Sequence, residues 1–179
     1  MLDLMDRMTD ATQRLLREPR GNGVLDRLSS RVRRFGGHAL VNRMVAAAIP
    51  FAGRNGFTVT DIRPGFLEAR IPLKGNRNHI GTLYAGAEFL LAEIPGGVLT
   101  LLEFGSAYFP ILEAMNMRFL APAKSDVTVT FRLSKQEIKR VRDEADREGR
   151  SRFILTGNLL DKDGRIVAQS EAHYVVRKK

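Results

Sequence analysis

The chain has 179 residues, 44% of them hydrophobic and 27% charged, which suits one globular domain with a core of its own and an appendage. It has no cysteine, so a disulfide framework, a thiolate metal site and a cysteine nucleophile are excluded. The formal net charge of +9 comes from lysines and arginines that are dispersed along the chain without a DNA-binding motif, so a solvated surface or a phosphorylated ligand is favoured over a nucleic-acid partner.

Residues 1–53 are expected to form an N-terminal helical extension. Apolar residues recur at spacings of three and four along residues 2–16 and 24–49, which predicts two amphipathic helices. The second helix is expected to pack on the domain that follows, because the short connection after Pro50 leaves little reach toward lipid. The acidic start lacks the basic region of a secretory signal, and no long apolar run lies near it, so a cytoplasmic protein without a membrane span is expected.

Residues 54–179 are expected to form one α+β domain. Apolar and polar residues alternate on either side of a Pro-Gly turn, which predicts a β-hairpin over residues 57–73. A nearly continuous apolar pattern predicts a long helix over residues 84–103. Further strands are expected over residues 115–121, 126–133, 152–161 and 165–177. A charged segment over residues 134–148 predicts a helical insertion between the second and third of these strands.

The long helix carries one carboxylate in an informative place. The apolar residues of this helix leave almost no polar face, so it is expected to be buried on most sides. Glu93 would lose hydration there unless it is paired or reaches a cleft, and burial without a partner raises the pKa of a carboxyl group. Pro95 and the two glycines after it are expected to make the helix irregular beside Glu93. Glu88 lies about 140° around the helix from Glu93 and is interpreted as structural.

A polar segment, residues 78–86, runs directly into the start of this helix. The first N–H groups of a helix have no intrahelical acceptor and favour negative charge. Gly86 and Glu93 are seven residues apart, about two helical turns, so the carboxylate is expected on the same helix face as these donors. The sequence therefore predicts one helix with an anion-stabilising end and a base.

Three motifs, taken in order, resemble one family. They are Asn78 with Gly81-Thr82-Leu83 and Glu93 fifteen residues on, residues 115–123 with a terminal Pro-Ala turn, and residues 163–169. Together they resemble the hotdog-fold acyl-CoA thioesterases, particularly the phenylacetyl-CoA type and a related group of unassigned substrate, over roughly residues 54–179. The resemblance implies a hotdog fold, in which an antiparallel sheet wraps around a long central helix. It also implies a thioester hydrolase without a cofactor, assembled as a homodimer or a dimer of dimers.

The resemblance gives each candidate residue a role. Glu93 would act as general base or as nucleophile, and the sequence does not separate the two. The Ala85 backbone N–H, with Gly86 beside it, would bind the oxyanion, and Asn78 would position the water or the carbonyl. Substrate contacts are expected from His79, Gly81, Thr82, Tyr84 and Asn116. The substrate would be a thioester of CoA or of acyl carrier protein, and no metal site is expected because the three histidines are scattered.

The chain departs from the family pattern at three places. Relatives usually open the helix with His-Gly-Gly where this chain has Tyr-Ala-Gly, and they often carry Asp in place of Glu93. Leu112 stands where some relatives have an assisting serine. A backbone donor at Ala85 does not depend on the side chain, so these departures affect the helper groups more than the oxyanion site.

Two other functions remain open at this stage. His79 and Glu93 are fourteen residues apart, which resembles acyl-carrier-protein dehydratases, although the Pro and Gly signature of those enzymes is missing. A non-catalytic acyl-CoA-binding protein, with its basic N-terminal helices on DNA or a membrane, is the other alternative, and Glu93 argues against it. The simpler structural interpretations are that Asn78 only forms a turn and that Glu93 occupies the exposed edge of its helix.

Overall fold

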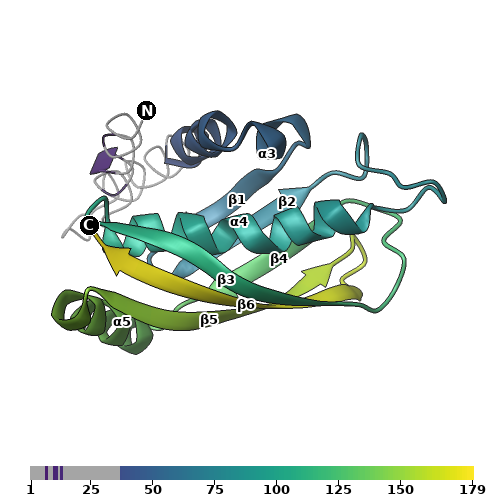
Figure 1. The fold of residues 1–179 in the computed structure, drawn as a ribbon. Coiled ribbons are helices and arrows are strands. Elements are labelled where there is room, and N and C mark those ends of the chain that lie inside the picture. The colour runs from purple at the N-terminus through teal and green to yellow at the C-terminus, as the bar shows by residue number, and fades with distance from the viewer. Residues whose placement is uncertain (1–6, 8–9, 12, 14–36) are drawn as a thin grey trace, which may run out of the picture.

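The computed structural model describes residues 7, 10, 11, 13 and 37–179 (Figure 1). A helix over residues 37–48 comes first among the longer described elements. The elements that follow are α3 (Pro50–Arg54), β1 (Thr58–Arg63), β2 (Phe66–Ile71), α4 (Ala85–Phe104), β3 (Tyr108–Phe119), β4 (Val127–Arg132), α5 (Lys135–Glu148), β5 (Arg150–Leu160) and β6 (Ile166–Lys178).

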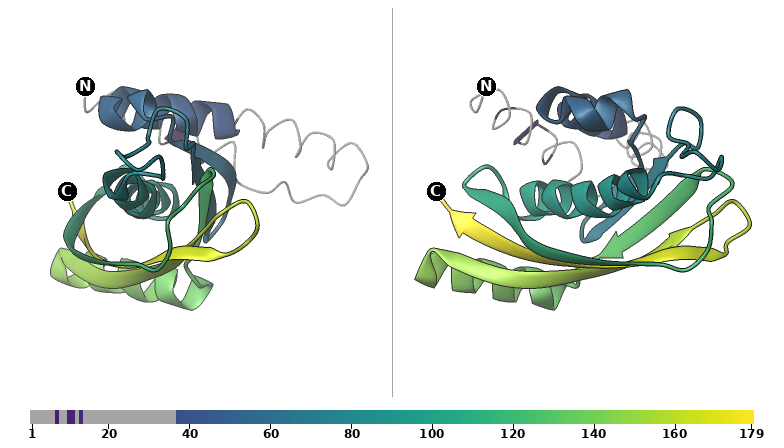
Figure 2. Two further views of the ribbon diagram at one scale, coloured as in Figure 1. Left: turned by 90° about the vertical axis from the view of Figure 1, so that its right-hand side faces the viewer. Right: turned by 45° about the vertical axis from the view of Figure 1, so that its right-hand side comes forward.

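One antiparallel sheet contains all six of these strands, in the order β1-β2-β4-β5-β6-β3. The sheet curves around α4, and the helix over residues 37–48 lies on the side of α4 opposite β5 and β6 (Figure 2). This is the arrangement that the resemblance implies. Strands β1 and β3 form the two edges of the sheet.

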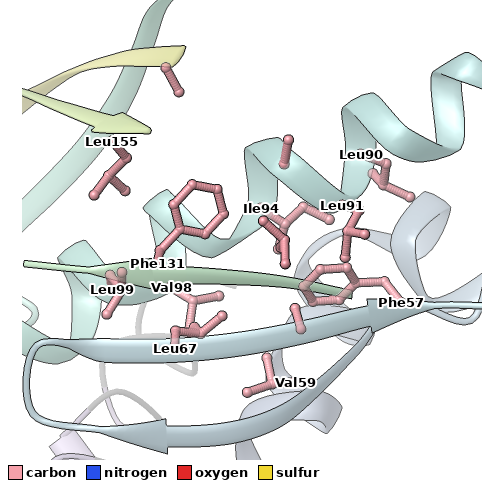
Figure 3. Packing of buried hydrophobic residues seen from close by; sticks show 14 of the residues in the cluster. Phe57, Val59, Leu67, Leu90, Leu91, Ile94, Val98, Leu99, Phe131 and Leu155 are labelled. Carbon is pink, nitrogen blue, oxygen red and sulfur yellow. The ribbon is translucent and has the colours of Figure 1, made fainter. Parts of the chain in front are cut away.

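The sheet and α4 enclose the hydrophobic core. Leu91 and Leu99 of α4 are fully buried, as are Leu67 of β2 and Phe131 of β4, which lie between the helix and the sheet (Figure 3). By length and composition the 20-residue helix α4 could cross a membrane, but it is the helix that the sheet wraps, and its apolar residues are explained by this core. Pro95 lies inside α4 without ending it.

The edge strand β3 begins earlier than the sequence predicts, at Tyr108 instead of residue 115. Pro110 lies within it, and proline is tolerated in a strand mainly at a sheet edge, where one side of the backbone needs no ladder partner. A bulge between Leu112 and Ala114 shifts the register against β6. The bulge reverses which residues of β3 face α4, because one added residue inverts the alternation of side chains.

Helix α5 confirms the helical insertion expected over residues 134–148. Ser134 is its N-cap and accepts a hydrogen bond from the Glu137 backbone N–H at 3.0 Å, and Gly149 closes it in the left-handed conformation with φ of 74°. Val141 and Ala145 are its buried residues, and the rest of the helix is charged. It packs beside the first half of β5, which β4 does not reach.

The helix over residues 37–48 packs on the domain, as the sequence predicts. Val41 and Met44 are buried, and Asn42 pairs with the backbone of Val59 in β1. The Asn42 amide N donates to the Val59 carbonyl at 3.1 Å, and the amide O accepts from the Val59 N–H at 2.7 Å. One side chain thus satisfies part of the β1 edge that would otherwise be open to another strand. The remainder of the two predicted N-terminal helices lies outside the described residues, apart from residues 7, 10, 11 and 13.

Candidate active site

The segment before α4 is a loop organised by Asn78. The Asn78 side-chain oxygen accepts hydrogen bonds from the backbone N–H groups of Ile80 and Thr82, both at 3.1 Å, and its amide N donates to the Thr82 hydroxyl at 2.9 Å. Gly81 has φ of 82°, in the left-handed region that glycine favours. Three of the four hydrogen-bonding positions of the Asn78 amide are therefore used to shape the loop, and one N–H remains for another group.

Two backbone contacts hold the end of this loop. The Leu83 N–H donates to the Ala123 carbonyl at 2.8 Å, in the Pro-Ala turn after β3, and the Tyr84 N–H donates to the Asn76 carbonyl at 2.8 Å. The Asn76 side chain is buried and donates to the carbonyl groups of Asn55 and Pro72, both at 2.8 Å. The start of α4 is therefore fixed in place by the segments that follow β2 and β3 and by the end of α3.

Helix α4 begins with two backbone donors that have no acceptor in residues 37–179. Tyr84 is the N-cap residue in extended conformation, and its carbonyl accepts from the N–H groups of Ala87 and Glu88. The N–H groups of Ala85 and Gly86 make no hydrogen bond within the described part of the chain. Ala85 is exposed and Gly86 half-buried, so both donors can be approached from outside. These are the donors that the sequence predicts for an oxyanion.

The side chains near these donors are mostly exposed. Tyr84 is 60% exposed, and its ring folds over Gly86, where an added Cβ would lie 2.4 Å from the ring. His79 is exposed and makes no hydrogen bond or ion pair within the described residues, whereas Thr82 is buried in the loop. The structure therefore brings the loop residues and the helix start together at one end of α4.

Glu93 lies on the one stripe of α4 that the protein leaves open. Gly86, Phe89, Glu93 and Gly97 recur at spacings of three and four, and each is at least partly exposed, whereas most other residues of the helix are buried. Gly97 lies against Pro110 of β3, so the stripe runs beside the edge strand. The Glu93 carboxylate has no hydrogen-bond or ion-pair partner among the described residues, and burial raises its pKa.

The donors and the carboxylate lie on one helix face, but within a single subunit they are too far apart to act on the same carbonyl group. Eight residues separate Ala85 from Glu93, which corresponds to about 12 Å along the helix axis. A reacting carbonyl needs its oxygen about 3 Å from a donor and its carbon about 3–3.5 Å from the attacking atom. A glutamate side chain does not span the remaining gap. The expectation of a shared face is met, yet it does not by itself assemble a site.

Asn116 lies on the other face of the sheet from these groups. It pairs with Glu171 of β6, which pairs in turn with Thr156 of β5, and all three side chains are exposed. A shallow polar groove on this face is lined by Asn116, Arg118, Thr156, Asn158, Gln169 and Glu171, among others. The structure therefore does not bring Asn116 to Glu93 or to the start of α4 in the same subunit, because the β3 bulge turns the neighbouring Met115 and Met117 inward instead.

Glu88, which the sequence marks only as structural, is the more deeply buried carboxyl group of α4. It is 4% exposed, and its Oε2 atom is buried and has no hydrogen-bond partner among the residues that the structure describes. Burial raises its pKa from 4.5 to about 7. The apolar positions around it gave a sequence signal for this burial, since Glu88 stands on the face of α4 that carries Leu91 and Pro95.

Replacement of Glu88 by glutamine should therefore change how stability depends on pH. The folded state holds the proton more tightly than the unfolded chain, so the Glu88 contribution is fully present below pH 4.5 and is lost as the pH rises to about 7. This shift corresponds to about 3 kcal/mol. Denaturant unfolding should be measured for both proteins between pH 4 and pH 8. As the pH rises, the free energy of unfolding of Glu88→Gln should increase relative to that of the parent by about this amount. A difference between the two proteins that stays constant over this range would contradict the assignment.

Among the described residues, no group of three or more His, Asp or Glu side chains could hold a metal ion. The arrangement available is thus a pair of free backbone donors, a carboxylate without a partner and an exposed helix stripe beside an edge strand. Such groups can stabilise a developing oxyanion and accept a proton, or attack a carbonyl carbon directly.

Comparison with protein families and known structures relates the chain to other proteins. The sequence pattern of a family described as a domain of unknown function (DUF4442) matches residues 37–176. A crystal structure of a protein of unknown function from Pseudomonas aeruginosa, described as a probable thioesterase, shares 40% sequence identity, with a TM-score of 0.75 over 79% of this chain and 95% of that one. No curated protein matches the chain.

More distant structures share the fold. A protein of unknown function from Chlorobaculum tepidum has 16% identity and a TM-score of 0.72 over 79% of this chain and 94% of that one. A thioesterase from Haemophilus influenzae has 15% identity and a TM-score of 0.64 over 79% of this chain and 90% of that one. With the six-stranded sheet wrapped around α4, these similarities confirm the hotdog fold that the sequence motifs imply.

Proposed function

We propose that this chain, which belongs to the DUF4442 family, is an acyl-thioester hydrolase that works as a homodimer. One observation carries the proposal: within the described part of the chain, α4 offers N–H groups at Ala85 and Gly86 without an acceptor and a half-buried Glu93 carboxylate without a partner. The similarity to a Pseudomonas aeruginosa protein described as a probable thioesterase supports the same reaction.

In this proposal the thioester carbonyl oxygen lies against the Ala85 N–H. This donor stabilises the negative charge that develops on the oxygen when the carbonyl carbon is attacked. Glu93 either removes a proton from the attacking water or attacks the carbon itself, and the product is a carboxylic acid and a free thiol. Burial raises the Glu93 pKa and so makes the carboxylate a stronger base than one in water.

In this proposal, a second copy of the chain brings a Glu93 carboxylate close to the Ala85 donor. In an antiparallel pair of α4 helices, Glu93 of one subunit faces the first turn of the other, which removes the separation of about 12 Å along one helix. The exposed stripe that carries Phe89, 42% exposed, would be covered by the partner, and Asn78 and Tyr84 would lie at the junction of the two helices. A single subunit would then hold only half of each site.

The edge of the sheet supports this assembly. Strand β3 is 12 residues long, and none of the described strands pairs with its outer side. Phe109, Ile111 and Phe119 on it are exposed. An open edge of this length with exposed apolar side chains favours pairing with another strand. The other edge, β1, is already occupied in part by Asn42. The twofold pairing of β3 with its own copy is therefore the favoured contact.

A mixture of two inactive variants tests this shared site. Ala85→Pro removes the proposed oxyanion donor and Glu93→Gln removes the proposed base, so each homodimer lacks one group in both sites. A mixed dimer with the two groups in opposite subunits has one intact site, and random co-assembly should return roughly a quarter of the parent activity. Free-thiol release from an acyl-CoA measures this recovery. Activity that does not return in a mixture shown to contain mixed dimers would contradict the shared site.

The substrate is proposed to be a thioester of CoA or of acyl carrier protein. Both carry a phosphopantetheine arm, and the net charge of +9 favours such an anionic substrate. The dehydratase alternative receives no support from the geometry, because His79 is exposed and makes no hydrogen bond or ion pair with a described residue, whereas a catalytic histidine is commonly oriented by a partner. A purely binding role would leave the unpaired Glu93 carboxylate without an explanation.

A further inference from the structure

Tyr174 contacts the backbone of Glu93 from the sheet that wraps α4. It lies on β6, is 2% exposed, and its hydroxyl donates a hydrogen bond to the Glu93 backbone carbonyl oxygen. The two residues are 81 positions apart in the chain. This contact links the sheet directly to the turn of α4 that presents the carboxylate.

The ring of Tyr174 is fixed on both faces. It stacks on Phe153 of β5 with a centroid distance of 5.3 Å and an angle of 15° between the ring planes. On the helix side it lies against Gly96, where an added Cβ would come within 2.2–2.4 Å of the ring and the hydroxyl. Only glycine at this position lets the hydroxyl reach the helix backbone.

The helix needs support at this point. Pro95 has no N–H, so the Leu91 carbonyl loses the bond that holds one turn to the next, and two glycines follow. Tyr174 adds a bond at Glu93 beside this weakened turn. Burial, and after it the negative charge of Glu93, raises the pKa of the Tyr174 hydroxyl above its ordinary value of 10, so the hydroxyl stays protonated and able to donate at neutral pH.

We infer that Tyr174 is a positioning residue for Glu93: its hydroxyl holds the Glu93–Gly96 turn against β6, so that the carboxylate stays on the open stripe of α4. This inference rests on the proposed thioesterase function. Gly96 is the second part of the same device, because it admits the tyrosine ring. Tyr174 does not contact the substrate in this proposal, and it affects the reaction only by fixing the position of Glu93.

The test compares two tyrosine-to-phenylalanine variants. Tyr174→Phe keeps the ring and removes the hydroxyl bond to Glu93. Tyr108→Phe is the matched control, because Tyr108 is also buried, at 7% exposed, and its hydroxyl donates to Asp146 at 2.6 Å on α5, away from Glu93. Both variants lose one tyrosine hydrogen bond, so thermal unfolding of the two proteins should show similar, small losses of stability.

The expected difference lies in the kinetics. Tyr174→Phe should lower kcat about 10- to 100-fold, as a displacement of about 1 Å does, with KM within about threefold of the parent, while Tyr108→Phe leaves both unchanged. In a plot of kcat against pH, the fall in kcat at acid pH (the acid limb) should also move to lower pH in Tyr174→Phe. A turn released from β6 exposes Glu93 and so reduces the burial that raises the pKa of this carboxyl group. A merely structural loss would lower the rate without moving this limb.

Three outcomes would overturn the inference or its premise. Equal kcat and an equal acid limb in Tyr174→Phe and the parent would overturn the positioning role alone. Equal losses in the two phenylalanine variants would do the same, since the control bond has no connection to Glu93. A parent protein that releases no thiol from any acyl thioester would overturn the proposed function itself, and the positioning role with it.

Discussion

Ala85→Pro is expected to lower kcat about 10²–10³-fold without unfolding the protein, which is the loss typical of one oxyanion donor. Proline has no N–H, so the substitution removes the backbone donor that no side-chain change can reach. Ala85 is the first helical residue of α4, a position at which proline is tolerated, and Tyr84 before it has φ of −69° and ψ of 135°, the extended conformation that a following proline requires.

Lys135→Pro provides the control for this substitution. Lys135 is the first helical residue of α5, and Ser134 before it has φ of −67° and ψ of 153°. The two variants therefore make the same change at two helix starts, of which only the start of α4 belongs to the proposed site. Thiol release should fall in Ala85→Pro and persist in Lys135→Pro, with thermal unfolding to show that both are folded. Full activity in a folded Ala85→Pro protein would remove Ala85 from the mechanism.

Glu93→Gln is expected to lower kcat at least about 10²-fold, within the range that general acid–base catalysis contributes. Glutamine keeps the size of the side chain and removes its charge and basicity. Burial raises the Glu93 pKa, so the parent should lose activity as the pH falls through a value above 4.5, and the residual activity of the variant should lack this acid limb.

Glu88→Gln is the matched control on the same helix, because it changes the same functional group about 140° away from the stripe. Its kcat should stay within about threefold of the parent, since Glu88 has no part in the proposed chemistry. Equal turnover by a folded Glu93→Gln protein and the parent would show that Glu93 is not the base or nucleophile, whatever reaction the protein performs.

The sequence predicts the local structure of the candidate site better than it predicts which of its residues lie together in space. The loop at Asn78, the start of α4 and the place of Glu93 follow from local spacing, because helix periodicity and turn chemistry act over a few residues. The position of Asn116 on the face of the sheet away from α4 could not be predicted from alternation along β3. The bulge after Leu112 exchanges the two faces of the strand, and no residue near it indicates a bulge in the sequence. The early start of β3 was hidden by Pro110, which is compatible with a strand only at a sheet edge.

Long-range contacts account for the rest. Tyr174 carries no local signal that connects it to Glu93, and only the fold shows that β6 crosses the helix at Gly96. The distance from Ala85 to Glu93 follows from the helix rise. The inference that a second subunit completes the site depends also on the open stripe of α4 and on the outer edge of β3, which pairs with no described strand. The burial of Glu88, in contrast, can be predicted from the helix face on which it lies, provided that the sheet is known to wrap around α4.

Free-thiol release from a panel of acyl thioesters tests the central claim most directly. The panel should contain straight-chain and aromatic acyl-CoA, an enoyl-CoA and an acyl-carrier-protein thioester, each assayed with the parent and with Glu93→Gln. The account predicts thiol release from at least one thioester by the parent, at least about 10²-fold slower in the variant, and no addition of water to the enoyl-CoA double bond. The absence of thiol release across the whole panel, or hydration of the enoyl-CoA without it, would contradict a thioester hydrolase.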